Sequence, residues 1–341
     1  MRRAALAGAF AAMFTATASG ADVRLMDFAD LHDWERDDHA AALVAFRETC
    51  GDLDDGDWPT ICALSESYGD ARTFFETFFR PVMITDGEEP LFTGYYEPEL
   101  PGSRTQTPKY NIPLYRRPDN APQGPWLTRE EIETSGVLEN RGLELVWIEH
   151  PVDKFFLQIQ GSGRIALNDG TGMRLGYGGK NGHPYRSVGQ ELARRGVFEA
   201  HQVSAQVIRN WVTKNPDEGE RLLHHNPSYV FFRDVTEQVP TSKGPLGAMN
   251  RPITALRSIA VDPDFVPLGA PVWVEKEGAE PFRHLMIAQD TGSAIKGAQR
   301  ADIFYGSGDN AGDVAGRVRD SGRMIVLLPI EDALALIDWD S

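Results

Sequence analysis

The chain has 341 residues, of which 41% are hydrophobic, and a formal net charge of −16. The acidic balance argues against nucleic acid as a partner, because nucleic-acid phosphates are bound by basic surfaces. This length and composition allow a large core, and the length alone predicts two domains.

Residues 1–21 predict a secretory signal peptide. Arg2 and Arg3 precede a short apolar run, and small residues follow it at positions 18–21. The run is too short to cross a bilayer, and no later stretch resembles a transmembrane segment. There is no cysteine at the expected cleavage point, where a lipid-anchored protein would need one. We therefore expect an exported protein with no transmembrane segment and no lipid anchor.

The segment from the signal peptide to Pro81 is predicted to be helical, because its apolar residues recur at helical intervals. It contains the two cysteines of the chain, Cys50 and Cys62. In an oxidising compartment they can close a disulfide loop, and two separate buried thiols are the alternative.

From Leu91 onward, short alternating runs broken by glycine, proline and Asn/Asp turns predict strands. The clearest predicted strand covers residues 154–167, with apolar residues alternating with two glutamines. An Asn-Asp-Gly turn at 168–170 then predicts a hairpin. A helical stretch follows, with Ser187 as its N-cap and a break near Gly196, before strands resume.

Two proline-rich polar segments, residues 105–122 and 236–247, are candidates for crossings between domains. We therefore predict a first domain made of residues 22–104 and 240–341. The second, β-rich domain is predicted to be inserted at residues 105–239. A cleft between such domains is a common place for a ligand.

The glutamines of the predicted strand, Gln158 and Gln160, precede the triplet Gly161-Ser162-Gly163. An amide offers a donor and an acceptor, and glycine lets a ligand approach the backbone, so this pattern suits a groove that binds sugar hydroxyls. A solvent-facing strand ending in a flexible turn is the alternative. Tyr95 and Tyr96 can add a surface that stacks on sugar rings, or can be ordinary core residues.

Asp302 shares a predicted strand face with Phe304, which would desolvate its carboxyl group and raise its pKa. Asp290 ends the preceding apolar strand, and a hairpin would bring the two carboxylates together and push one pKa upward. Each aspartate alone can also be a turn or capping residue. The histidines lack metal-ligand spacing, so no metal and no cofactor are predicted.

Several long motifs, in this order along the chain, resemble those of the lytic murein transglycosylase A (MltA) family, bacterial cell-wall enzymes that cleave the glycan strands of peptidoglycan. The motifs are FTGYYEP (92–98), DKFFLQIQGSGRI (153–165), YGGKNGHPYRSVG (177–189), NPSYVFFR (226–233), GPLGAMNRPITALRSIAVDPDFVPLGAPVWVE (244–275) and QDTGSAIKGAQRADIFYGSG (289–308).

The resemblance implies a mainly β fold, with a double-psi β-barrel domain, an inserted β-rich domain and an N-terminal helical segment. It implies a groove for a peptidoglycan glycan strand, with Asp302 as the catalytic aspartate, Asp290 as its supporting neighbour and Asp262 as a structural residue of a three-aspartate module. The implied substrate-binding residues are Thr93, Gly94, Tyr95, Gln158, Gln160, Gly161, Ser162, Gly163 and Tyr185, with Lys296 and Arg300 as further candidates.

The implied reaction needs one carboxyl group. Protonated Asp302 would donate to the oxygen linking N-acetylmuramic acid to N-acetylglucosamine, and its carboxylate would then accept the C6 hydroxyl proton as that oxygen attacks C1. The product is a 1,6-anhydro end. One alternative is a hydrolase in which Asp290 or Glu97 activates water, and another is a non-catalytic glycan-binding protein.

Family members are often outer-membrane lipoproteins, and this chain lacks their anchoring cysteine. We expect a periplasmic enzyme that is free or held at the outer membrane by protein contacts. Partners in a cell-wall remodelling complex, the oligomeric state, an exo or endo mode and a preference for peptide-bearing glycan are left open by the sequence.

Overall fold

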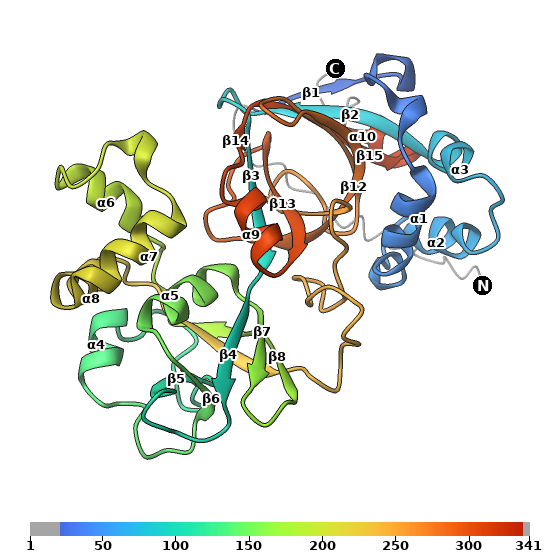
Figure 1. Ribbon diagram of the computed structural model, residues 1–341. Helices are drawn as coiled ribbons and strands as arrows, with labels where there is room; N and C mark the ends of the chain where they lie inside the picture. The colour runs from blue at the N-terminus through green and yellow to red at the C-terminus, as the bar shows by residue number, and fades with distance from the viewer. Residues whose placement is uncertain (1–20, 337–341) are drawn as a thin grey trace, which may run out of the picture.

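The computed structural model describes residues 21–336, so the predicted signal peptide lies outside the described residues except for its last position. Two sheets organise the described chain, one of nine strands and one of six. The larger sheet curls into a nearly closed barrel, and the smaller one lies beside it with its own helices (Figure 1). No helix in residues 21–336 is both long and apolar enough to span a membrane.

The barrel sheet combines strands from both ends of the chain, in the order β1-β2-β15-β11-β12-β10-β13-β3-β14. Most neighbours are antiparallel, but β10 runs parallel to β12 and β13 runs parallel to β3. The strands are β1 (Asp22–Leu25), β2 (Phe79–Thr85), β3 (Leu91–Glu97), β10 (Ser258–Val261), β11 (Pro271–Lys276), β12 (Phe282–Thr291), β13 (Arg300–Ser307), β14 (Arg319–Asp320) and β15 (Gly322–Pro329).

The predicted N-terminal helices pack on this sheet. They are α1 (His39–Arg47), α2 (Trp58–Ser65) and α3 (Ala71–Phe78). Phe46 of α1, Phe74 of α3 and Phe79 of β2 pack against one another with their side chains buried. Burying a side chain of this size stabilises the fold by about 2 kcal/mol. The mainly β class with a helical N-terminal segment is thus as predicted.

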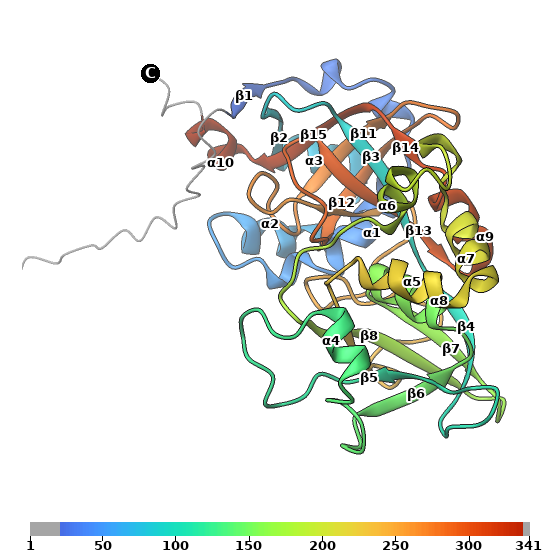
Figure 2. The same cartoon turned by 90° about the vertical axis from the view of Figure 1, so that its left-hand side faces the viewer.

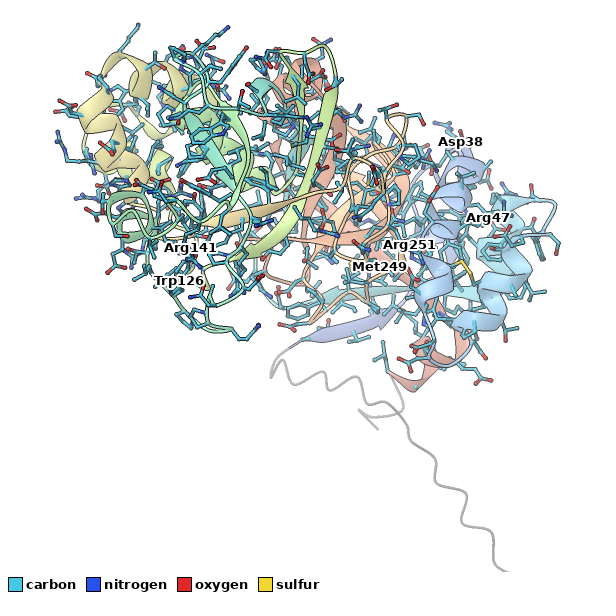
Figure 3. All side chains as sticks on the ribbon, turned by 90° about the horizontal axis from the view of Figure 1, so that it is seen from below. Asp38, Arg47, Trp126, Arg141, Met249 and Arg251 are labelled. Atoms are coloured by element: carbon cyan, nitrogen blue, oxygen red, sulfur yellow. A yellow bond between two sulfur atoms is a disulfide. The ribbon has the colours of Figure 1, made fainter. Side chains whose placement is uncertain are left out.

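Cys50 and Cys62 form a disulfide, with their Cα atoms 5.4 Å apart. Figure 3 shows this bond among the N-terminal helices, on the same side of the molecule as Arg47. The bond ties the 3-10 helix η3 (Cys50–Asp52) to α2.

The smaller sheet has the order β5-β6-β4-β7-β8-β9 and lies wholly within the middle of the chain. Its strands are β4 (Glu99–Ser103), β5 (Ile112–Tyr115), β6 (Glu144–Ile148), β7 (Gly163–Leu167), β8 (Gly172–Lys180) and β9 (Val230–Asp234). The helices of this part are α4 (Arg129–Thr134), α5 (Pro151–Gln160), α6 (Val188–Arg194), α7 (Ala205–Lys214) and α8 (Pro216–His224). The remaining elements are η1 (Phe28–Asp30), η2 (Trp34–Arg36), η4 (Ala200–Gln202), α9 (Asp309–Ala315) and α10 (Ile330–Ala335).

The strand predicted at residues 154–167 is wrong in its first half, which belongs to helix α5. Pro151 occupies the first turn, where its missing N–H costs nothing, and Gly161 ends the helix with φ of 77°, in the left-handed conformation that glycine adopts without strain. Val152 and Phe155, three residues apart, share its buried face. The second half is β7, and the predicted hairpin to β8 is confirmed.

The predicted helical stretch after Ser187 is also confirmed. The Ser187 side chain accepts a hydrogen bond from the Gln190 backbone N–H at the start of α6, and the helix ends before Gly196, whose φ is 71°.

Candidate active site

A cavity of about 600 Å³ separates the barrel from the smaller sheet. We call it the groove. The barrel part contributes residues 245–248 and 290–295 together with Asp302, and the other wall comes from the end of α5, from β8 and from β9. Helix α5 lies on the side of the smaller sheet that faces the barrel, in both views (Figures 1 and 2). It thereby brings residues 158–162 to the groove.

Asp290 and Asp302 reach the groove from β12 and β13. The predicted hairpin between these strands is wrong, because β10 lies between them. Ala260 of β10 pairs with Asp290 on one side and with Asp302 on the other. An earlier segment of the chain is inserted between two consecutive long strands, which a local sequence pattern does not encode.

The carboxyl group of Asp302 is held by a chain of hydrogen bonds. The Thr93 hydroxyl donates to Asp302 Oδ1 at 2.6 Å, and Arg300 Nη2 donates to the Thr93 hydroxyl oxygen at 2.8 Å. Burial raises the pKa of Asp302, while the Thr93 hydrogen bond and the charge of Arg300 act against that rise. The net result is a carboxyl group that holds its proton more tightly than an ordinary aspartate.

Asp290 accepts three hydrogen bonds. The Tyr95 hydroxyl donates to Oδ2 at 2.9 Å, and the backbone N–H groups of Ala248 and Thr291 donate to Oδ1 at 3.0 and 2.9 Å. Burial nevertheless raises the pKa of Asp290 to about 6, helped by the nearby charge of Asp302 and opposed by the hydrogen bonds. Burial and Asp290 together raise the pKa of Tyr95 well above its usual value, so this hydroxyl keeps its proton and remains a donor.

Five other predicted site residues line the groove beside the two aspartates: Gln158, Gln160, Gly161, Ser162 and Tyr185. Gln158 Nε2 donates to the carbonyl oxygen of Val230, and Gln160 Oε1 accepts from the Tyr96 backbone N–H, so both amides are oriented by the protein. Two further predicted residues bond to the aspartates: Thr93 donates to Asp302 and Tyr95 donates to Asp290.

The remaining four predicted residues neither line the groove nor bond directly to its two aspartates. A Cβ on Gly94 would lie 2.8 Å from the Cα of Ala315, and one on Gly163 would lie 2.3 Å from Leu157 Cδ1, so both glycines allow close packing. Lys296 Nζ instead donates to Asp262 Oδ1 at 2.8 Å. Besides Thr93, Arg300 donates to the carbonyl oxygens of its neighbours Leu91 and Ala301.

Glu97, the alternative base, lies outside the groove and is completely buried. Arg174 donates to both of its carboxylate oxygens at 2.9 Å, and Arg164 and Ser307 donate to Oε2 at 2.8 and 2.7 Å. Its oxygens are therefore committed to protein donors.

Several groove residues were not predicted from the sequence, namely Arg129, Lys180, Arg233 and Ala248, whose backbone N–H bonds to Asp290. Lys180 could have been found, because it stands five residues before Tyr185 in the same motif. The Ala248 N–H has no sequence signal, since every residue except proline carries that donor. Within residues 21–336 no group of three or more His, Cys, Asp or Glu side chains is placed to hold a metal ion.

Matches to family models cover both parts of the structure. The model described as the MltA specific insert domain matches residues 91–233, and the model described as the 3D domain matches residues 257–328.

Named relatives and solved structures agree with these matches. Membrane-bound lytic murein transglycosylase A of Vibrio cholerae is 32% identical over 80% of this chain and 74% of its own length. A crystal structure of MltA from Neisseria gonorrhoeae covers 91% of this chain and 93% of its own at 32% identity, with a TM-score of 0.79. Escherichia coli MltA with bound chitohexaose covers 88% and 90% at 28% identity, with a TM-score of 0.71.

The barrel, the inserted sheet and the matched relatives define an enzyme of the lytic murein transglycosylase class. The chain belongs to the MltA family.

Proposed function

We propose that this protein is a lytic transglycosylase that cleaves the β-1,4 bond between N-acetylmuramic acid and N-acetylglucosamine in peptidoglycan and leaves a 1,6-anhydro end. The V. cholerae relative is named for lytic murein transglycosylation, and E. coli MltA binds chitohexaose. The observation that carries the proposal is Asp302, a carboxyl group with a raised pKa in a groove of about 600 Å³.

Asp302 acts twice in the proposed reaction. In its protonated form it donates to the glycosidic oxygen, so that the bond from C1 of the muramic acid residue breaks and the leaving sugar departs as an alcohol. The resulting carboxylate accepts the proton of the C6 hydroxyl as the C6 oxygen bonds to C1. The proton balance closes, no water is consumed, and Asp302 is protonated again for the next cycle.

Thr93 and Arg300 orient this carboxyl group. The Thr93 hydroxyl bonds to Oδ1, which leaves Oδ2 as the oxygen that can face the substrate. Because Arg300 bonds to Thr93 rather than to Asp302 itself, its charge lowers the pKa of Asp302 less than a direct ion pair would.

Asp290 is the supporting carboxyl group. Its pKa of about 6 is raised mainly by burial and in part by the charge of Asp302, so the two carboxyl groups titrate as a coupled pair. When Asp290 is ionised, its charge would favour the positive charge that develops at C1 as the glycosidic bond breaks.

The two-carboxylate hydrolase remains the alternative, with Asp290 as the group that would activate water. Glu97 is not available for that role, because its oxygens are bonded to two arginines and a serine. Carboxyl groups with raised pKa values cluster at catalytic sites, so the raised pKa of Asp302 argues against a glycan-binding protein without activity.

A division into two domains fits the pairing of the strands into two separate sheets. We place the first crossing at Pro98 rather than at residue 104, because β4 already pairs with β7 in the smaller sheet. The return crossing is placed near residue 240, after β9 and before β10. The barrel domain then comprises residues 22–98 and 240 onward.

The proposed location is the periplasm, with residues 1–21 as a cleaved signal peptide. The V. cholerae relative is named membrane-bound, which supports an envelope-associated protein. For this chain we propose attachment to the outer membrane through protein contacts.

The deciding experiment is a digest of purified peptidoglycan with the wild type and with Asp302→Asn, followed by mass spectrometry of the released fragments. Wild-type protein should release anhydro fragments, lighter by one water than hydrolytic ones. Asp302→Asn should be slower by at least about a hundredfold. Asp309→Asn, at an exposed aspartate in α9, is the matched control and should be active. Reducing-end products would establish the two-carboxylate hydrolase instead. Binding of peptidoglycan without release of fragments would establish the non-catalytic glycan-binding protein.

A further inference from the structure

The charges of the groove are segregated between its two walls. Its acidic residues, Asp290 and Asp302, both stand on the barrel. Its basic residues, Arg129, Lys180 and Arg233, all stand on the inserted part, in α4, β8 and β9. In a chain with a net charge of −16, a wall that carries only cations is a specific feature of this site.

Two of these cations have protein partners. Arg129, which is 2% exposed, donates to the carbonyl oxygens of Asn226 and Ser228 at 3.2 and 2.8 Å. Arg233 donates to the carbonyl oxygen of Tyr177 and to the side chain of Asn250. Their guanidinium groups therefore already donate hydrogen bonds to other parts of the protein.

Lys180 is different. It is exposed, it lines the groove, and its ammonium group has no hydrogen-bond or ion-pair partner among residues 21–336. No acidic residue stands on its own wall of the groove. A free cation in that position is available to a ligand.

An irregularity in β8 lies just before Lys180. The register of β8 against β9 shifts between Tyr177 and Gly179, which inserts an extra residue just before Lys180 pairs with Val230. Glycine is required there: a Cβ on Gly178 would lie 2.5 Å from the Phe232 carbonyl oxygen, and Gly179 has φ of 115°. Such bulges re-aim side chains next to functional sites, because one extra residue exchanges the faces of a strand.

We propose that Lys180 binds a carboxylate carried by the muramic acid residue of the glycan strand. This inference rests on the proposed function. N-Acetylglucosamine is uncharged, whereas N-acetylmuramic acid carries a lactyl ether that ends in a carboxyl group. That group is an anion in a naked strand, and in a peptide-bearing strand it is an amide leading to a peptide with carboxylates of its own.

The contact would set the register of the strand. The two sugars alternate, and only the bond from C1 of a muramic acid residue gives a 1,6-anhydromuramic end. A strand shifted by one sugar would present the wrong bond to Asp302. A cation on the wall opposite the acidic pair selects the register in which the muramic acid carboxylate points away from Asp290 and Asp302.

Binding measurements on the full mature chain with Asp302→Asn, which is expected to slow turnover at least about a hundredfold, test this proposal. Four ligands are compared by calorimetry: chitohexaose, a naked glycan hexasaccharide, the same hexasaccharide with its lactyl carboxyl groups converted to methylamides, and a peptide-bearing hexasaccharide. Adding Lys180→Gln should weaken binding of the naked strand about fivefold, the size of an exposed ion pair. It should leave chitohexaose and the methylamide unchanged. Lys214→Gln, at an exposed lysine in the last turn of α7, is the matched control and should change none of the four.

The peptide-bearing strand identifies the source of the carboxylate. Weakening for the naked strand identifies the lactyl group, and weakening for the peptide-bearing strand alone identifies the stem peptide. The effect should shrink as salt is raised from low ionic strength. Equal weakening of chitohexaose, or no weakening of either anionic strand, would overturn the proposal. The wild-type digest reports separately on the proposed function, because anhydro ends form or fail to form there whatever Lys180 binds.

Discussion

Asp290 and Asp302 flank the same residue, Ala260, from the two strands that neighbour β10. Two strand spacings separate their backbones, about 10 Å. Their hydrogen-bond partners nevertheless come from one strand, β3, where Tyr95 serves Asp290 and Thr93 serves Asp302. Residues two apart on a strand point to the same face, so β3 positions both carboxyl groups from one side.

The first prediction concerns the stability cost of Asp290. Its pKa is about 6 in the folded protein against 3.8 for an ordinary aspartate, so between these pH values the folded state binds more protons than the unfolded state. The stabilising effect of that proton is complete below about pH 4 and is lost as the pH rises through 6, at a cost of about 3 kcal/mol.

Asp290→Asn removes this cost. The amide oxygen can still accept from Ala248 and Thr291, and its N–H can donate to the Tyr95 oxygen, so the hydrogen bonds are conserved. The variant should be more stable than the wild type at pH 7.5 by roughly 3 kcal/mol, with a difference that becomes small near pH 4. Urea unfolding at the two pH values measures both, and a variant less stable than the wild type at pH 7.5 would refute the account.

The second prediction concerns the pH dependence of cleavage. Asp302 must be protonated to donate, so the rate should fall as the pH rises through its pKa. The Thr93 hydroxyl stabilises the ionised form, and Thr93→Val should therefore raise that pKa further and move the falling limb of the pH–rate profile to higher pH. Thr93→Ser keeps the hydroxyl and should return the limb to its original position. A shift to lower pH in the valine variant would contradict the proposed role.

The third prediction concerns the disulfide. Replacing Cys50 and Cys62 by alanine together should lower the free energy of unfolding by about 3 kcal/mol, because the bond restricts the unfolded chain. The rate of peptidoglycan cleavage should not change, since neither residue lines the groove. A reducing agent should destabilise the wild type by a similar amount and leave the double variant unaffected. Equal unfolding curves for the two oxidised proteins would show that the bond contributes nothing.

Local sequence patterns predicted part of this fold. The N-terminal helices, the β7–β8 hairpin and the Ser187 cap depend on neighbouring residues, and these were predicted correctly. Helix α5 was missed, because Phe155 to Gln160 alternate like a strand while the residues that decide the matter, Pro151 and Gly161, stand at its ends.

Long-range pairing could not be predicted from such patterns. Ala260 lies between Asp290 and Asp302 because a segment some thirty residues earlier enters the barrel between their strands, and nothing in the period of any of the three strands specifies that order. The family motifs indicated both aspartates. The segregated charges of the groove arise only when separate segments pack together.

The last prediction concerns Glu97, which joins the barrel to the inserted sheet. It ends β3, two residues after Tyr95, and its carboxylate is bonded to Arg164 of β7 and Arg174 of β8. The same two arginines donate to the carbonyl oxygens of Pro240, Thr241 and Lys243. One buried carboxylate is therefore linked through them to both segments in which the chain passes between the two domains.

Glu97→Gln should cost about 3 kcal/mol of folding free energy, because it leaves Arg174 buried without a compensating charge. The cleavage rate should fall as well, since the partners of both aspartates stand on the same strand and the groove lies between the two parts that this ion pair joins. Glu99→Gln, at an exposed glutamate two residues further on, is the matched control and should change stability by less than about 0.5 kcal/mol. Urea unfolding and the peptidoglycan digest measure the two effects. If the two variants unfold at the same urea concentration, the buried ion pair does not hold the two parts together.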